Sequence, residues 1–145
     1  MFRQILMVFE HTLASEAAVS YTIGFARRMD APVTLLMLSP MAFVRTTYLG
    51  SQRNALQRIE DHAGRFLAEC TERFVQEGLE VHSALRVGDP AQELLKYLAD
   101  RPPFQALIWG GSGELPPRTH WLSRVADTLE CPLLSVNKKN GPLGL

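Results

Sequence analysis

Two glycines that follow a short apolar run are spaced as in a phosphate-binding turn. Gly110 and Gly113 come directly after Ala106–Trp109 and lie three positions apart. Backbone N–H groups in such a glycine-rich turn can cradle a phosphate, because no side chain keeps the ligand away. A tight turn from a strand into a helix is the alternative interpretation, and these residues alone favour it.

Motifs of better-defined chemistry are missing from the sequence. No G-x-G-x-x-G follows the first apolar run, and no Gly-Lys-Ser or Gly-Lys-Thr is present for a P-loop. A nucleophile elbow requires G-x-S-x-G, and Glu114 stands where the second glycine around Ser112 would be. A phosphoacceptor receiver needs an aspartate after its third strand, which here runs out at Val87 and Gly88. We therefore predict that the protein is not an enzyme.

Single polar and aromatic residues at the ends of apolar runs are further candidates. Glu10 follows the first run, where its carboxylate could accept hydrogen bonds from a ribose or a base, or be solvated. Trp109 could stack on a base, and it could equally fill the edge of a sheet. His11 and His120 fall where the ligand is expected to enter. His62 and His82 fall at positions that suit solvated or capping residues.

Alternating strands and helices are expected to position these residues. Five apolar or alternating segments predict strands, at 5–9, 33–38, 81–87, 106–109 and 133–136. Apolar residues at helical spacing predict helices from residue 12 or 15 to 29, over 51–77, from Pro90 to the break at Arg101, and over 119–130. Asp89 is the expected N-cap of the third helix and Gly78 the stop of the second. The alternation indicates a doubly wound α/β sheet, in which ligands bind beyond the carboxyl ends of the strands.

Composition limits the classes of partner and compartment. The chain has 145 residues, the length of one domain, and its 15 Lys and Arg balance 15 Asp and Glu. This balance lacks the basic surplus that nucleic-acid binding requires. Cys70 and Cys131 are too few for a disulfide framework and have no metal-ligand spacing, so we expect buried thiols in a reducing compartment. Strand-sized apolar runs and the lack of a signal peptide predict a cytoplasmic protein that does not interact with a membrane.

Two segments fall outside the regular alternation. Residues 39–50 have no clear period and are long for a loop, and they offer apolar side chains for contact with a partner or with their own domain. Residues 138–145 are polar and contain glycine and proline. They predict a flexible tail after a single domain of residues 1–137.

Several segments of the chain resemble the universal stress protein family. The most specific is VGDPAQELL, from Val87 to Leu95. The other matching segments are FEHT at 9–12, ARRM at 26–29, APVTLL at 31–36 and CPLLSV at 131–136. The resemblance implies an open, doubly wound, five-stranded parallel sheet with strand order 3-2-1-4-5 and helices on both faces.

The resemblance also implies a nucleotide site. In the ATP-binding branch of the family, a glycine motif follows the fourth strand. Its first two glycines are separated by two residues, and nine residues further on comes a third glycine followed by Ser or Thr. Gly110 and Gly113 match the first two glycines, but the final pair falls on Ser123-Arg124, or on Thr119-His120 when the loop is shortened. Neither alignment restores the motif. The residues that the resemblance implies for nucleotide binding are Val8, Phe9, Glu10, Leu38, Trp109, Gly110, Gly113, Thr119 and His120.

We expect a stress-response protein that acts by binding, with a degenerate nucleotide site and no cofactor. Glu10 is one methylene longer than the family's aspartate and His11 replaces its glycine, and both would crowd an adenosine pocket. Two alternatives are an ATP- or AMP-binding protein with slow or no ATPase activity, and a module that uses residues 39–50 to bind an unidentified protein. Family dimers often pair through the last strand, which predicts a homodimer through Leu133, Leu134, Ser135 and Val136.

Overall fold

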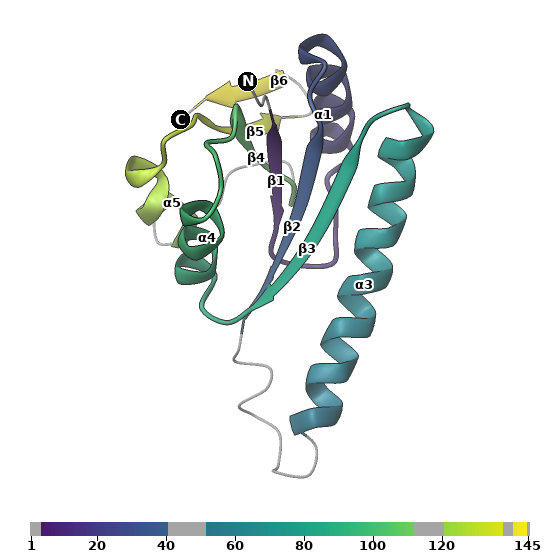
Figure 1. Cartoon of the computed structure of the whole chain (residues 1–145), viewed down its shortest axis with the longest axis vertical. Coiled ribbons are helices and arrows are strands. Elements are labelled where there is room, and N and C mark those ends of the chain that lie inside the picture. The colour runs from purple at the N-terminus through teal and green to yellow at the C-terminus, as the bar shows by residue number, and fades with distance from the viewer. Residues whose placement is uncertain (1–3, 41–51, 112–120, 138–140, 145) are drawn as a thin grey trace.

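The computed structural model describes residues 4–40, 52–111, 121–137 and 141–144 of the chain. They form one six-stranded sheet in the order β3-β2-β1-β4-β5-β6, with helices on both faces (Figure 1). Neighbouring strands from β1 to β5 pair in parallel, which confirms the predicted order 3-2-1-4-5. The elements are β1 (Ile5–Phe9), α1 (Glu16–Met29), β2 (Val33–Ser39), α3 (Gln52–Gln76), β3 (Val81–Val87), α4 (Pro90–Ala99), β4 (Ala106–Trp109), α5 (Trp121–Val125), the 3₁₀ turn η2 (Ala126–Thr128), β5 (Leu133–Asn137) and β6 (Gly141–Gly144).

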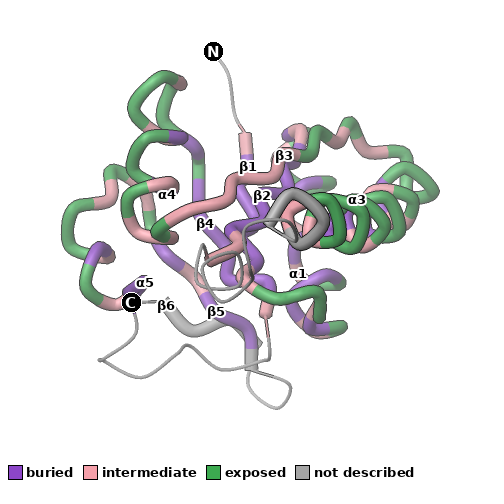
Figure 2. Tube along the Cα trace, turned by 90° about the horizontal axis from the view of Figure 1, so that it is seen from below, coloured by how far each residue is buried: buried purple, intermediate pink, exposed green. Residues whose placement is uncertain are grey.

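The side chains of the central strand β1 alternate between two core layers. Ile5, Met7 and Phe9 pack in the layer of α1 and α3. Leu6 and Val8 pack in the layer of α4 and α5. All five are fully buried because helices cover both faces of a parallel sheet (Figure 2). The continuous apolar run at 5–9 is explained by this two-sided burial.

Side-chain caps set where α1 and α4 begin. The Ser15 hydroxyl oxygen accepts a hydrogen bond from the Ala18 N–H at 3.2 Å. The Asp89 carboxylate accepts one from the Gln92 N–H at 3.1 Å, with Pro90 in the first turn, which confirms Asp89 as the N-cap. α4 starts shortly after β3, and α1 follows β1 after residues 10–15, where the Ser15 N–H donates to the carbonyl of Gly110 at the end of β4. Both helices therefore have their N-terminal ends near the carboxyl edge of the sheet.

The helix before β5 is shorter than the sequence predicts. A helix over 119–130 was expected, but α5 ends at Val125 and the chain tightens into η2, where the Thr128 hydroxyl donates to the Val125 carbonyl at 2.7 Å. Residues 119 and 120 lie outside the described part of the chain. The long helix was wrong because this local hydrogen bond favours the tighter turn before the chain enters β5.

The end of the chain also differs from the expected flexible tail. Gly141–Gly144 forms β6, antiparallel to β5, with Gly144 opposite Leu134 and Gly141 opposite Asn137. An outer strand leaves N–H and C=O groups unpaired, and a returning segment satisfies them even when it is rich in glycine and proline. β6 therefore occupies the edge of β5 through which a homodimer was predicted, and the homodimer stays a prediction. Among the helices that the structure describes, none is long and apolar enough to cross a membrane.

Candidate functional site

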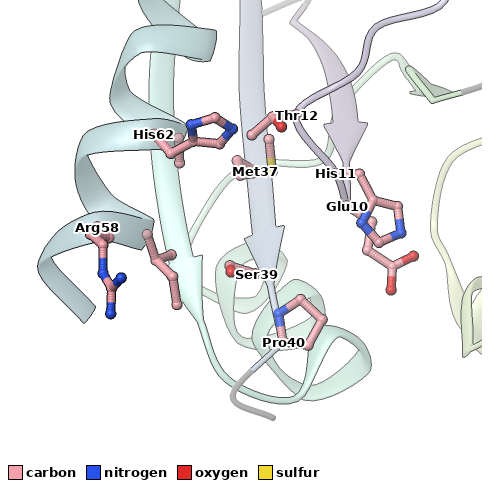
Figure 3. A pocket seen from close by; sticks show the side chains of 10 residues that line it. Glu10, His11, Thr12, Met37, Ser39, Pro40, Arg58 and His62 are labelled. Atoms are coloured by element: carbon pink, nitrogen blue, oxygen red, sulfur yellow. The ribbon is translucent and has the colours of Figure 1, made fainter. Parts of the chain in front are cut away.

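A pocket opens where the first two strands end. β1 and β2 are in register, with Phe9 opposite Met37, so the residues that follow each strand meet at one edge of the sheet. The pocket has a volume of about 310 Å³. Its lining residues come from the end of β1, the end of β2 and one face of α3: Glu10, His11, Thr12, Met37, Ser39, Pro40, Arg58, Ile59, His62 and Ala63 (Figure 3).

The wall of the pocket is the overhanging first part of α3. The 25 residues of α3 span about 37 Å, whereas the seven residues of β3 span about 23 Å. The helix therefore extends past the carboxyl edge of the sheet (Figure 1). This overhang brings Arg58 and His62 beside the ends of β1 and β2.

The side chains around the pocket divide into two groups. The His62 ring points from α3 towards Thr12, across Met37 on β2 (Figure 3). Glu10 and His11 turn away from α3, and Arg58 extends away from the centre of the pocket (Figure 3). Met37, Ile59 and Ala63 supply apolar contact surface, while hydroxyl and imidazole groups supply a few polar contacts. Such a mixture suits a compact organic ligand with polar edges.

Gly110 has a packing role that explains why it is glycine. A Cβ at this position would lie 2.7 Å from Cδ1 and 2.9 Å from Cζ of Phe9, and closer still to Cε1. The Phe9 ring is fully buried and meets Phe66 edge-on, with ring centroids 5.0 Å apart. The Gly110 N–H donates to the Val8 carbonyl at 2.8 Å, and its carbonyl accepts from the Ser15 N–H at 2.9 Å. Both backbone groups serve the fold, which supports the tight-turn interpretation of this glycine.

The predicted nucleotide residues are only partly brought together. Glu10 lines the pocket, whereas the side chains of Val8 and Leu38 are fully buried in the layer of α4 and α5. Trp109 is buried in that same layer and meets Trp121 edge-on with ring centroids 6.5 Å apart, so its ring is part of the core. Phe9 lies in the opposite layer. Three predicted residues lie outside the described part of the chain, namely Gly113, Thr119 and His120.

The sequence analysis missed the contribution of α3 to the pocket. His62 was interpreted as a solvated or capping residue, and Arg58, Ile59 and Met37 were not considered as site residues. His62 is exposed, as expected, but it also lines the pocket. The available signal was the predicted length of the helix, since a helix longer than its neighbouring strands must overhang the sheet.

The two cysteines offer no reactive thiolate near neutral pH. Burial raises the pKa of the Cys70 thiol to about 11, against an opposing effect of Arg73. Burial also raises the pKa of Cys131, with Glu130 acting in the same direction. Among the described residues, no group of three His, Cys, Asp or Glu could hold a metal ion.

Comparisons with known proteins agree with the fold. The model of the universal stress protein family matches residues 1–136. The chain is similar to the universal stress protein UspA from Lactobacillus plantarum, with TM-score 0.67, 17% identity and coverage of 91% of this chain and 95% of that one. A comparison with curated proteins finds no match.

Two other similar structures were determined with a nucleotide. One is a universal stress protein family protein from Arabidopsis thaliana with AMP bound, with TM-score 0.59, 14% identity and coverage of 95% of this chain and 93% of that one. The other is the universal stress protein from Archaeoglobus fulgidus in complex with dAMP, with TM-score 0.59, 17% identity and coverage of 92% and 95%. At such low identities these likenesses demonstrate the shared fold, while the match over residues 1–136 identifies the chain as a member of the universal stress protein family.

Proposed function

We propose that this protein acts by binding a small ligand, without catalysis, and that the ligand is an adenine nucleoside or its monophosphate. The observation that carries the proposal is the pocket of about 310 Å³ at the carboxyl ends of β1 and β2. Ligands of doubly wound sheets bind at this edge, and the volume is at the lower end of the range for small-molecule sites.

The chemistry of the pocket supports a purine ligand. A purine has apolar faces and polar edges, so it needs apolar walls with a few hydrogen-bonding groups. Met37 and Ile59 are apolar wall residues, and Thr12, Ser39 and His62 carry donors and acceptors. Two proteins of the same fold were determined with AMP and with dAMP, which favours adenine over other bases.

The sequence that follows β4 argues against tight binding of a triphosphate there. The Gly110 N–H already donates to the Val8 carbonyl, so it does not offer a hydrogen bond to a phosphate. The final Gly-Ser pair of the ATP-binding motif is also missing. Binding free energy then comes mainly from the nucleoside, and the nucleotide site is degenerate at its phosphate end.

The homodimer through Leu133–Val136 belongs to the same proposal, with one condition. β6 is paired along the outer edge of β5, with Leu143 opposite Ser135. A second copy can pair with β5 only where β6 has left that edge. Removal of the last residues of the chain tests this condition.

Calorimetric titration with adenosine and AMP tests the ligand. We expect saturable binding, and we expect His62→Ala to weaken it about fivefold, because base–aromatic stacking is worth about 1–3 kcal/mol. His82→Ala is the matched control, since His82 is also exposed but lies on β3 outside the pocket. No heat at millimolar nucleoside, or equal weakening by both variants, would overturn the proposal.

A further inference from the structure

A second cavity continues the pocket along α3. It has a volume of about 190 Å³ and is lined by Thr12, His62, Arg65, Phe66 and Glu69. Thr12 and His62 also line the first pocket, so the two cavities adjoin at these side chains. We refer to the two adjoining cavities together as the α3 groove, since residues of α3 line both of them.

Arg65 is the cation of this extension. Its side chain is exposed and lines the cavity three residues after His62, on the same face of α3. Within the described part of the chain, Arg65 forms no ion pair. Arg73 lies about two turns further along the helix and differs, because its guanidinium donates to both carboxylate oxygens of Glu16 at 2.7 Å and 2.6 Å. Arg65 therefore has donors available for an anion that enters the groove.

A carboxylate also lines the second cavity. Glu69 is one turn beyond Arg65 and lines the same cavity. One further turn along α3, Arg73 holds Glu16 from the first turn of α1. An anion next to Arg65 is attracted by the guanidinium, but an anion placed further along meets the negative charge of Glu69. With one arginine followed by one glutamate along α3, the second cavity favours a ligand that carries a single anionic group.

We propose that this groove selects a nucleoside monophosphate over a triphosphate, with Arg65 binding the single phosphate and Glu69 repelling any further phosphate. The proposal rests on the proposed function, which supplies the nucleoside in the first pocket. In this arrangement the phosphate pairs with a cation from α3. The Gly110 N–H at the end of β4 is not available to it, because that group donates to the Val8 carbonyl. Arg65 is thus a specificity residue, and its guanidinium can form two parallel hydrogen bonds to phosphate oxygens.

Titrations of adenosine, AMP and ATP in magnesium-free buffer test the proposal. We expect AMP to bind about fivefold more tightly than adenosine, since an exposed ion pair contributes up to about 1 kcal/mol. Arg65→Gln should lower the affinity for AMP to that for adenosine. Glu69→Gln should raise the affinity for ATP more than the affinity for AMP. Arg28→Gln is the matched control, since Arg28 is an exposed arginine of α1 that lines neither cavity.

The outcomes separate this proposal from the proposed function. If adenosine binds but Arg65→Gln leaves the AMP-to-adenosine ratio unchanged, the phosphate lies elsewhere and only this inference fails. If Arg58→Gln abolishes the ratio instead, the ligand lies in the opposite orientation, which also overturns it. If neither adenosine nor AMP binds the wild-type protein, the proposed function and this inference fail together.

Discussion

Substitution of Gly110 by alanine tests the packing at the end of β4. The added Cβ would lie within 3.0 Å of three atoms of the Phe9 ring, a distance that real Cβ contacts essentially never show. The ring cannot easily move aside, because Phe9 is fully buried and packs edge-on against Phe66. Either the ring or the Val8–Gly110 hydrogen bond must shift.

The cost can be compared with other overpacked cores. Inserting a methyl group into a well-packed core destabilises a protein by about 1–3 kcal/mol. For a chain of 145 residues, a loss of about 2 kcal/mol lowers the melting temperature by about 6 °C. Thermal unfolding followed by circular dichroism measures this shift directly.

A control in the same protein should change stability in the opposite direction. Gly64 lies inside α3, and a Cβ there would meet nothing within 4 Å. Gly64→Ala should therefore stabilise the protein by about 0.5–1 kcal/mol, because alanine favours the helix and restricts the unfolded chain.

A double-mutant cycle isolates the contact with Phe9. Phe9→Leu replaces the ring by a smaller side chain, so the additional loss from Gly110→Ala should shrink in that background. The reasoning would be refuted if Gly110→Ala unfolds at the wild-type temperature. It would also be refuted if Gly110→Ala costs the same stability in the Phe9→Leu background as in the wild-type protein.

Three further predictions concern other parts of the fold. Asp89→Ala removes the N-cap of α4 and should lower the free energy of unfolding by about 1 kcal/mol in a urea titration, and an unchanged midpoint would mean that the cap contributes nothing. The free energy of unfolding should fall as the pH rises from 9 towards 11, because the Cys70 thiol loses its proton at a lower pH in the unfolded chain than in the fold, where its pKa is about 11. Urea titrations at pH 8 and pH 10 should show a smaller fall for Cys70→Ala, and an equal fall would contradict the assignment. Ending the chain at Asn137 removes β6 and should produce concentration-dependent dimers in light scattering, whereas a truncated chain that stays monomeric would exclude pairing through β5.

The fold was largely predictable because its strongest signals are local. The continuous apolar runs at Ile5–Phe9 and Ala106–Trp109 are buried on both faces, and the Asp89-Pro90 pair marks a helix start. The shortened α5 and the strand β6 were missed for the same physical reason. Both elements depend on hydrogen bonds that form only in the folded protein, in the 3₁₀ turn after α5 and between β5 and β6. The periodicity of apolar side chains in the sequence does not predict these hydrogen bonds.

The candidate site was predictable only in part. The edge of the sheet where ligands of this fold class bind follows from the strand order, and the structure places Glu10 in the lining of the pocket at that edge. Which side chains reach the edge from a neighbouring helix depends on the length and phase of α3, so His62 and Arg58 were missed. Trp109 illustrates the opposite case, since a strand-end aromatic residue can face a ligand or the core and here faces the core.

The overhang of α3 has a consequence for local unfolding. The side chains described from Leu56 to His62 include none that is buried, and Ala63 is the first buried residue among the described side chains of the helix. Helical turns with no fully buried side chain gain little stability from tertiary packing, so the turns from Leu56 to His62 should exchange their amide protons through local opening with a small free energy. A ligand that bridges His62 and Thr12 adds its binding free energy to these turns and slows their exchange. Ligand binding in the pocket would thereby make the exposed start of α3 more ordered. A protease or a partner protein that recognises this helix end would then distinguish the bound from the free protein.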